Sequence, residues 1–432
     1  MKHIYGIILL AMFFSFTGKT FAQGIEFFQG DFAQALAKAK EEGKLVFVDF
    51  YAGWCGPCKQ LDANVFTDAI VGKYYNEKFV SIKVDTENAD DRAIVKKYKV
   101  SSLPTLLFLK PDGKLISRST GSMKGADFLK LGKIAAGDEL SFEELYEKYK
   151  SSKNDLTLMQ RILEEAPAFV SIQEGVDRDK WITRVERLYE MYIKEKIGPE
   201  LINKTDYKII NKFHKPAGRD DKLIEFMNSH MQAYLENVGK APAMYVIERH
   251  KQVLQDLARS GNVEYKTELA RIEGDMALSY SVLPEKKLSA YEYQKAISDA
   301  DYVLFHEKDA KKYVEMKNRY FNEMGEDVTE LDYGVAAQTL YQAMGSKIPQ
   351  DVQLQLRKWI ETALTFPKLN LMNKVNFLVM LGDNYRDLHD YAHAKEYYNQ
   401  AFMESIQMEQ EMTKAMIQMR IKQKLAALDL IK

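Results

Sequence analysis

Residues 45–59 read Leu45-Val46-Phe47-Val48-Asp49-Phe50-Tyr51-Ala52-Gly53-Trp54-Cys55-Gly56-Pro57-Cys58-Lys59. The first six of these residues are mostly apolar, which is typical of a buried strand. Two cysteines follow, three positions apart, and a helical pattern begins at the second one. We therefore expect Cys55 at the junction of a strand and a helix, where unpaired backbone N–H groups and the helix dipole favour a thiolate.

The spacing of the two cysteines predicts thiol–disulfide chemistry. We expect Cys55 to be the attacking thiolate, because it occupies the junction. Cys58 lies on the same side of the first helical turn, so it can close onto Cys55 and resolve a mixed disulfide with a substrate. We expect Cys58 to be the more buried of the two.

Two other interpretations of the cysteine pair stay open. Half of a zinc site would need two more ligands, but the sequence holds no further cysteine and no histidine between His3 and His214. A permanent structural disulfide would close a loop of only four residues, which constrains little entropy of the unfolded chain. We expect no metal ion and no cofactor.

Length and composition set the number of domains and the class of protein. A chain of 432 residues exceeds what one core usually serves, so two or more domains are expected. The composition is 46% hydrophobic with 23 Gly and 10 Pro, which is typical of a folded globular chain. Because 61 basic residues nearly balance 62 acidic ones, nucleic-acid binding is not expected.

The first 22 residues predict a signal peptide. A short basic start at residues 1–3 precedes an apolar stretch at 4–16 that is too short to span a bilayer, and Thr20-Phe21-Ala22 offers small residues for cleavage after Ala22. The alternative is an uncleaved anchor. No later segment approaches 18 uninterrupted apolar residues, so we expect the mature chain not to span a membrane.

Residues 23–138 alternate between apolar runs and helical patterns. Strands are predicted at 45–50, 79–84 and 105–109, and helices at 31–42, 58–75 with a break near Val65, and 89–98. Pro111-Asp112-Gly113 is a turn signal, so strands at about 105–110 and 115–120 should form a hairpin. This alternation predicts an α/β layer fold with a central sheet and flanking helices.

Residues 139–432 lack clear strand patterns and show apolar residues at three- and four-residue spacing. We predict an all-helical domain that opens with a capping box at Ser141. Seven prolines are expected to mark helix starts and breaks in this region, namely Pro167, Pro199, Pro216, Pro242, Pro284, Pro349 and Pro367.

One segment of the helical domain, residues 375–408, resembles a tetratricopeptide repeat. In this repeat, small residues lie where two helices contact each other, and aromatic residues fill the space between the helices. The matching positions here are Leu381-Gly382, Tyr385, Ala394, Tyr398 and Ala401. Ile406 replaces the closing proline, and residues 359–364 match only in degenerate form. A stack of helical hairpins is predicted, with an ordinary helical bundle as the alternative.

Residues 46–59 are similar to the active-site strand, turn and helix of the thioredoxin family. The resemblance extends to Ser102-Leu103-Pro104-Thr105, which stands at the cis-proline loop of that family, and to Gly121, which follows the last strand. Tyr51-Ala52 and the segment Val65-Phe66-Thr67-Asp68 look most like the C-terminal domain of DsbD-type disulfide-interchange reductases. The resemblance covers about a quarter of the chain and implies a thioredoxin fold.

The resemblance also implies roles for residues around the cysteines. Asp49 would be a buried carboxyl with a raised pKa that accepts the proton of Cys58, the alternative being a carboxylate bonded to backbone at the strand end. The family places a lysine near this carboxyl, at a position that aligns here with Ser81, and Lys83 lies two residues further on the same strand face.

Substrate contacts are implied for the residues that flank the cysteines. Pro104, if cis, would hold the backbone of Leu103 open beside Cys55, so that an extended peptide could pair with it; a trans proline that ends a loop is the alternative. Trp54 would shield the disulfide. Gly56 and Pro57 form the dipeptide of the reducing family members, which favours reduction or isomerisation over oxidation.

These observations together predict an exported thiol–disulfide oxidoreductase. Its domains would be a signal peptide at 1–22, a thioredoxin-like domain at 23–138 and an all-helical domain at 139–432. The expected partners are disulfide-containing proteins and an upstream dithiol electron donor, with a membrane reductase as one candidate. The periplasm of a bacterium is the expected compartment, and secretion is the alternative. The rival function is an interaction adaptor whose helical domain binds a partner.

Overall fold

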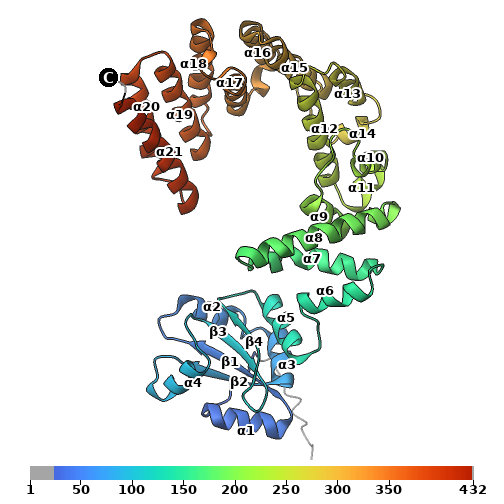
Figure 1. Ribbon diagram of the computed structural model, residues 1–432, viewed down its shortest axis with the longest axis vertical. Coiled ribbons are helices and arrows are strands. Elements are labelled where there is room, and N and C mark those ends of the chain that lie inside the picture. The colour runs from blue at the N-terminus through green and yellow to red at the C-terminus, as the bar shows by residue number, and fades with distance from the viewer. Residues whose placement is uncertain (1–23, 431–432) are drawn as a thin grey trace, which may run out of the picture. The chain divides into compact units, whose positions relative to one another are not determined.

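The computed structural model describes residues 24–430 of the chain. The predicted signal peptide, residues 1–22, lies outside the described residues. The chain divides into two compact units, and the boundary lies between Leu158 and Met159 (Figure 1). The first unit contains the α/β layer and also helix α6 (Phe142–Ser151). The domain boundary that the sequence indicates at 138/139 stays a prediction.

The first unit is built on a four-stranded sheet in the order β2-β1-β3-β4. The strands are β1 (Leu45–Tyr51), β2 (Phe79–Asp85), β3 (Thr105–Leu109) and β4 (Leu115–Thr120). Strand β1 pairs parallel with β2 and antiparallel with β3, while β3 and β4 form the predicted hairpin. The sheet is therefore mixed, and β1 lies inside it with a hydrogen-bonded neighbour on each side.

Helices cover both faces of this sheet. Alternate residues Val46, Val48 and Phe50 of β1 pack in one cluster with side chains of α1 (Phe32–Glu42) and α4 (Arg92–Lys97). Phe47 packs in the other cluster, with side chains of α2 (Gly56–Asn64), α3 (Ala69–Lys78) and α5 (Gly125–Ala136). Because strand side chains alternate between faces, Asp49 points to the same side as Phe47, toward the α2 face.

The predicted helices of this unit are confirmed, with ends set by local caps. Helix α1 begins after Asp31, whose side chain accepts a hydrogen bond from the Gln34 N–H in a capping box. The predicted break near Val65 separates α2 from α3, and Asp68 caps α3 by accepting hydrogen bonds from the backbone N–H groups of Ile70 and Val71. A short 3-10 turn, η1 (Ala89–Asp91), precedes α4.

Residues 139–430 form helices joined by turns and loops, with no strand, as the sequence predicts. Ser141 forms the predicted capping box with Glu144 at the start of α6. The helices that follow are α7 (Leu156–Ser171), α8 (Gly175–Lys196), α9 (Lys204–Phe213), α10 (Lys222–Ser229), α11 (Met231–Asn237), α12 (Ala241–Arg259), α13 (Tyr265–Arg271), α14 (Ala277–Tyr280), α15 (Ala290–Tyr302), α16 (Ala310–Met324), α17 (Glu330–Met344), α18 (Gln350–Leu364), α19 (Leu371–Asp387), α20 (Tyr391–Ser405) and α21 (Glu411–Asp429). Short 3-10 helices lie at η2 (Pro199–Leu201), η4 (Gly325–Asp327) and η5 (Gly345–Lys347), and η3 (Val303–Glu307) is a π-helix. No helix within residues 24–430 combines the length and the apolar character needed to cross a bilayer.

One proline departs from its expected place. Pro242 lies in the first turn of α12 and Pro349 caps α18, as helix starts. Pro167, however, lies inside α7, so the expectation that it marks a break was wrong. Proline lacks the backbone N–H that would bond to the carbonyl of Leu163 four residues earlier, and the helix ends four residues after Pro167, at Ser171.

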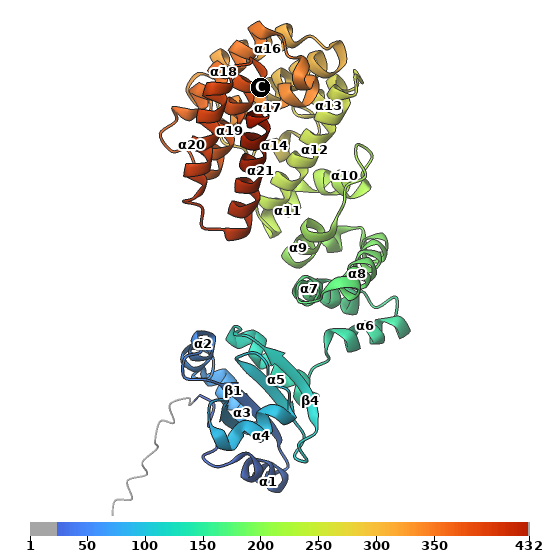
Figure 2. The same cartoon turned by 60° about the vertical axis from the view of Figure 1, so that its left-hand side comes forward.

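The segment that resembles a tetratricopeptide repeat forms a helical hairpin of α19 and α20, followed by α21 (Figure 2). Gly382 lies against Tyr398, since a Cβ at Gly382 would stand 2.4 Å from the Tyr398 ring. Ala394 and Ala401 are buried beside it. The small and large residues thus meet as the repeat pattern requires, while membership in the tetratricopeptide class stays a prediction.

We expect Gly382→Ala to lower the free energy of unfolding by about 1–3 kcal/mol, because the added methyl must displace a buried aromatic ring. The Tyr398 hydroxyl donates a hydrogen bond of 2.6 Å to Asp383, which limits how far the ring can move. Urea denaturation followed by circular dichroism measures the change. Gly125→Ala is the control, since its Cβ would meet Val71 at an ordinary 3.8 Å. Equal stability of the two variants would contradict the packing described here.

Candidate active site

The two cysteines lie at the junction between the end of β1 and the start of α2. Cys55 is the residue that caps α2, and Gly56 and Pro57 occupy the first two positions of the helix. The Cys58 N–H donates a hydrogen bond of 3.2 Å to the Cys55 Sγ. An N–H group of the first turn therefore already points at the sulfur, and in the reduced protein it would stabilise a thiolate there.

Cys55 and Cys58 form a disulfide. Their exposed fractions are 3% and 2%, so burial does not separate the two cysteines in this oxidised state. Ala52 is buried beside them, and Tyr51 and Leu103 pack against the group. The pair therefore lies in a small apolar pocket between the end of β1, the start of α2 and the loop before β3.

The loop before β3 carries a cis peptide bond between Leu103 and Pro104, the conformation on which the predicted substrate contact depends. The Pro104 carbonyl accepts a hydrogen bond from the Gly121 N–H. Within residues 24–430, the backbone N–H and C=O of Leu103 make no hydrogen bond. The Leu103 backbone is thus available for pairing with an extended chain, next to the cysteines.

Asp49 is a buried carboxylate within β1, only 1% exposed. Its Oδ2 lies 3.1 Å from the Lys83 Nζ, and its Oδ1 has no hydrogen-bond partner among the described residues. Burial raises the pKa of Asp49 to about 6, although the Lys83 charge acts in the opposite direction. A carboxyl with this pKa can take up and release a proton close to neutral pH.

Lys83 connects Asp49 to a second carboxylate. The parallel register of β1 and β2 places Lys83 directly opposite Asp49. Its ammonium also contacts Asp62 of α2 and lies 4.6 Å above the Tyr51 ring. Asp62 is four residues after Cys58, so it lies on the same face of α2 as the resolving cysteine. The network therefore links the buried carboxyl to the helix that carries Cys58.

The sequence named Lys83 on the right strand face without assigning it to Asp49, and it did not identify Asp62. The family position for the lysine aligns with Ser81, but Ser81 faces Phe47 in the register and Lys83 makes the contact with Asp49. The in-register pairing of two apolar strands was the signal that could have selected Lys83. For Asp62, the signal was its four-residue spacing from Cys58.

Trp54 is 71% exposed next to Cys55, although the sequence predicts that it shields the disulfide. Its indole N–H donates a hydrogen bond of 3.2 Å to the Glu87 carboxylate. An indole that is fixed at one edge and open on its faces offers a contact surface beside the cysteines.

Residues 32–136 match the family model described as thioredoxin-like domain. Thioredoxin-1 of Drosophila melanogaster is 36% identical over 95 residues, which are 22% of this chain and 79% of that protein. The thiol:disulfide interchange protein DsbD of Salmonella typhimurium is 41% identical over 98 residues, which are 22% of this chain and 17% of that protein. This chain therefore spans about a sixth of the DsbD relative.

A solved structure was also matched in part. The crystal structure of the oxidised C-terminal domain of Neisseria meningitidis DsbD is 26% identical, with a TM-score of 0.21. The match covers 23% of this chain and 87% of that domain.

We expect Asp49→Asn to raise the free energy of unfolding at neutral pH. The folded pKa of about 6 exceeds the ordinary 3.8, so the folded protein binds a proton more tightly than the unfolded chain. Stability contributed by this group therefore falls as pH rises from about 4 to about 6, and the loss above that range is about 3 kcal/mol. Urea denaturation at pH 8 and at pH 3.5 measures the difference, which should vanish at the lower pH. A destabilised Asp49→Asn variant at pH 8 would contradict this account.

We expect Lys83→Met and Asp62→Asn to move the Asp49 pKa in opposite directions. Removing Lys83 removes the charge that lowers the Asp49 pKa, so the pKa should rise. Removing Asp62 deletes a charge that raises it, so the pKa should fall. Carboxyl carbon NMR titration of the oxidised protein measures both shifts. Shifts in the same direction would show that the charges do not act on Asp49 as described.

Proposed function

Because the chain belongs to the thioredoxin family and is a thiol–disulfide oxidoreductase, we propose that it reduces or isomerises disulfides in exported proteins. The observation that carries this proposal is the cysteine pair at the start of α2, joined to a buried Asp49 network through that helix. The Gly56-Pro57 dipeptide supports the reducing direction over the oxidising one.

Reduction of a substrate would run in two exchange steps. The Cys55 thiolate attacks one sulfur of the substrate disulfide, forms a mixed disulfide and releases one substrate thiolate. Asp49 then accepts the proton of the Cys58 thiol, and the Cys58 thiolate attacks the Cys55 Sγ. The second substrate thiolate leaves, and the Cys55–Cys58 disulfide remains. Two electrons have passed to the substrate, and an external dithiol must return two electrons to the pair.

Substrate would bind as an extended segment along the loop before β3. The unpaired backbone of Leu103, held by the cis bond to Pro104, supports strand-like pairing with such a segment. The exposed Trp54, together with Gly56 and Pro57, supports contact on the other side of the disulfide. This arrangement favours unfolded or flexible protein substrates over compact ones.

Export of the protein rests on the predicted signal peptide. Cleavage after Ala22 would leave Gln23 as the first residue of the mature chain. N-terminal sequencing of the protein from a periplasmic extract tests this proposal, and a chain that still starts at Met1 would argue against it. The electron donor would then be a dithiol on the outer side of the inner membrane, which is consistent with the similarity to DsbD.

We expect the Cys55–Cys58 pair to have a reduction potential near or below about −230 mV, on the scale of reducing family members. Equilibration in glutathione or dithiothreitol buffers measures it. Cys58→Ser should accumulate mixed disulfides with protein substrates, because the attacking thiol stays and the resolving thiol is gone. Cys55→Ser, the matched control, should accumulate none. A potential above about −150 mV would instead assign an oxidant, and a pair that does not exchange would assign the function to the helical region.

A further inference from the structure

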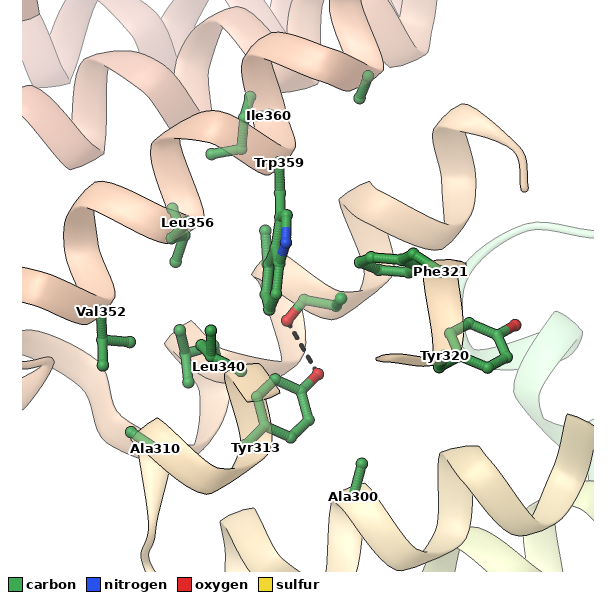
Figure 3. Close-up of a cluster of buried hydrophobic side chains, with 14 of the residues drawn as sticks. Ala300, Ala310, Tyr313, Tyr320, Phe321, Leu340, Val352, Leu356, Trp359 and Ile360 are labelled. Atoms are coloured by element: carbon green, nitrogen blue, oxygen red, sulfur yellow. Dashed lines mark hydrogen bonds between the residues drawn. The ribbon is translucent and has the colours of Figure 1, made fainter. Parts of the chain in front are cut away.

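The helical unit buries one lysine without an anionic partner. Lys317 of α16 is only 6% exposed. Its ammonium lies 4.4 Å from the Tyr320 ring centre and 5.5 Å from the Phe321 ring centre. Figure 3 shows these two rings on the helix that also carries Tyr313, whose hydroxyl donates to the Ala336 carbonyl. Within residues 24–430, the Lys317 ammonium makes no ion pair and no hydrogen bond.

The buried carboxylates of residues 24–430, unlike Lys317, all have a partner of opposite charge. A buried charge is costly unless it is paired. Each buried acidic side chain of the described residues has a basic partner, and the pairs are Asp49–Lys83, Asp206–Lys196, Asp221–His214, Glu268–Arg219 and Asp301–Arg259. The unmatched charge therefore lies at Lys317.

Lys317 lines a cavity of about 260 Å³ between α12, α15, α16 and α17. The two carboxylates in the cavity wall, Asp301 and Asp332, already have hydrogen-bond or ion-pair partners other than Lys317. Asp301 pairs with the Arg259 Nε at 2.7 Å, and Asp332 accepts hydrogen bonds from the Thr329 N–H and hydroxyl in the cap of α17. Asp332 also accepts a hydrogen bond from the Tyr320 hydroxyl.

The cavity wall combines apolar side chains with the donor side chains of Lys317, Lys286 and Gln255. Lys286 and Gln255 line it beside Lys317, and none of the three side chains makes an ion pair or hydrogen bond with the residues the structure describes. An almost fully buried ammonium, with a second ammonium and an amide in the same lining, attracts an anion that accepts hydrogen bonds in several directions. A carboxylate has two such oxygens, and the volume suits a small group of this kind.

We propose that this cavity binds a carboxylate, which pairs with the Lys317 ammonium. Burial lowers the Lys317 pKa to about 8, although the charges of Asp301 and Asp332 act in the opposite direction, and a bound anion would return it further toward its ordinary value. The carboxylate could belong to a small free acid or to an acidic side chain of a polypeptide. The two sources share the same chemistry at Lys317, and the proposal is independent of the thiol–disulfide function.

Calorimetric titration of the full chain with succinate, and with a short peptide that contains one Glu, tests the proposal. The same peptide with Gln in place of Glu is the ligand control. We expect succinate or the Glu peptide to bind and the Gln peptide to bind at least about tenfold more weakly. Succinate binding alone would assign a free acid, and binding of the Glu peptide alone would assign a polypeptide. Failure of both, or equal binding of sulfate, would overturn the carboxylate site.

Two variants separate a ligand site from a structural lysine. Lys317→Met should weaken binding at least about tenfold and leave the thermal midpoint of the free protein unchanged or higher, because an unpaired buried charge is removed. Lys311→Met, on the exposed side of α16 and paired with Asp351, is the matched control and should bind normally. Val335→Phe narrows the cavity from an exposed position and should weaken binding with Lys317 intact. Normal binding by both Lys317→Met and Val335→Phe would overturn the proposal.

Discussion

The enclosure of strand β1 is the constraint on which the active site depends. With a strand paired on each side and helices over both faces, β1 has no freedom to shift by one residue, because such a slip would exchange its two sets of side chains between the helical layers. That fixed register sends Asp49 toward α2 and sets Lys83 opposite it. The last residues of β1 then deliver Cys55 to the start of α2. A packing requirement far from the disulfide thus determines the electrostatics near it.

The charge network is a compromise between burial and proton transfer. A carboxylate with an ideal salt bridge would have a low pKa and would be a poor base near neutral pH. Lys83 divides its charge between Asp49 and Asp62, and one Asp49 oxygen is left without a partner. Burial therefore raises the pKa of Asp49 to about 6 despite a cation at 3.1 Å. The arrangement sacrifices stability at neutral pH and retains a usable base.

Local patterns were sufficient to predict the sheet, its helices and the cysteine pair. Apolar runs, the Pro111-Asp112-Gly113 turn and the caps at Asp31 and Ser141 each act over a few residues, so a single sequence reveals them. Lys83 required the pairing of two strands that are separated by two helices. Lys317 required more, because its surroundings come from α12, α15 and α17, although Tyr313, Val314, Tyr320 and Phe321 place it on the apolar face of its own helix. The prediction of a break at Pro167 was wrong because a proline in the sequence does not show whether the helix ends there or continues for another turn.

The number of cysteines indicates that folding of the protein does not depend on the disulfide that carries its chemistry. Both cysteines of the sequence belong to the exchanging pair, and the loop that they close is too short to restrict the unfolded chain by much. The two layers packed on β1 and the clusters of the helical unit are made of apolar contacts that electron transfer leaves in place. The chain can therefore reach its native shape under oxidising or reducing conditions alike. A thiol–disulfide oxidoreductase built in this way needs no structural disulfide of its own.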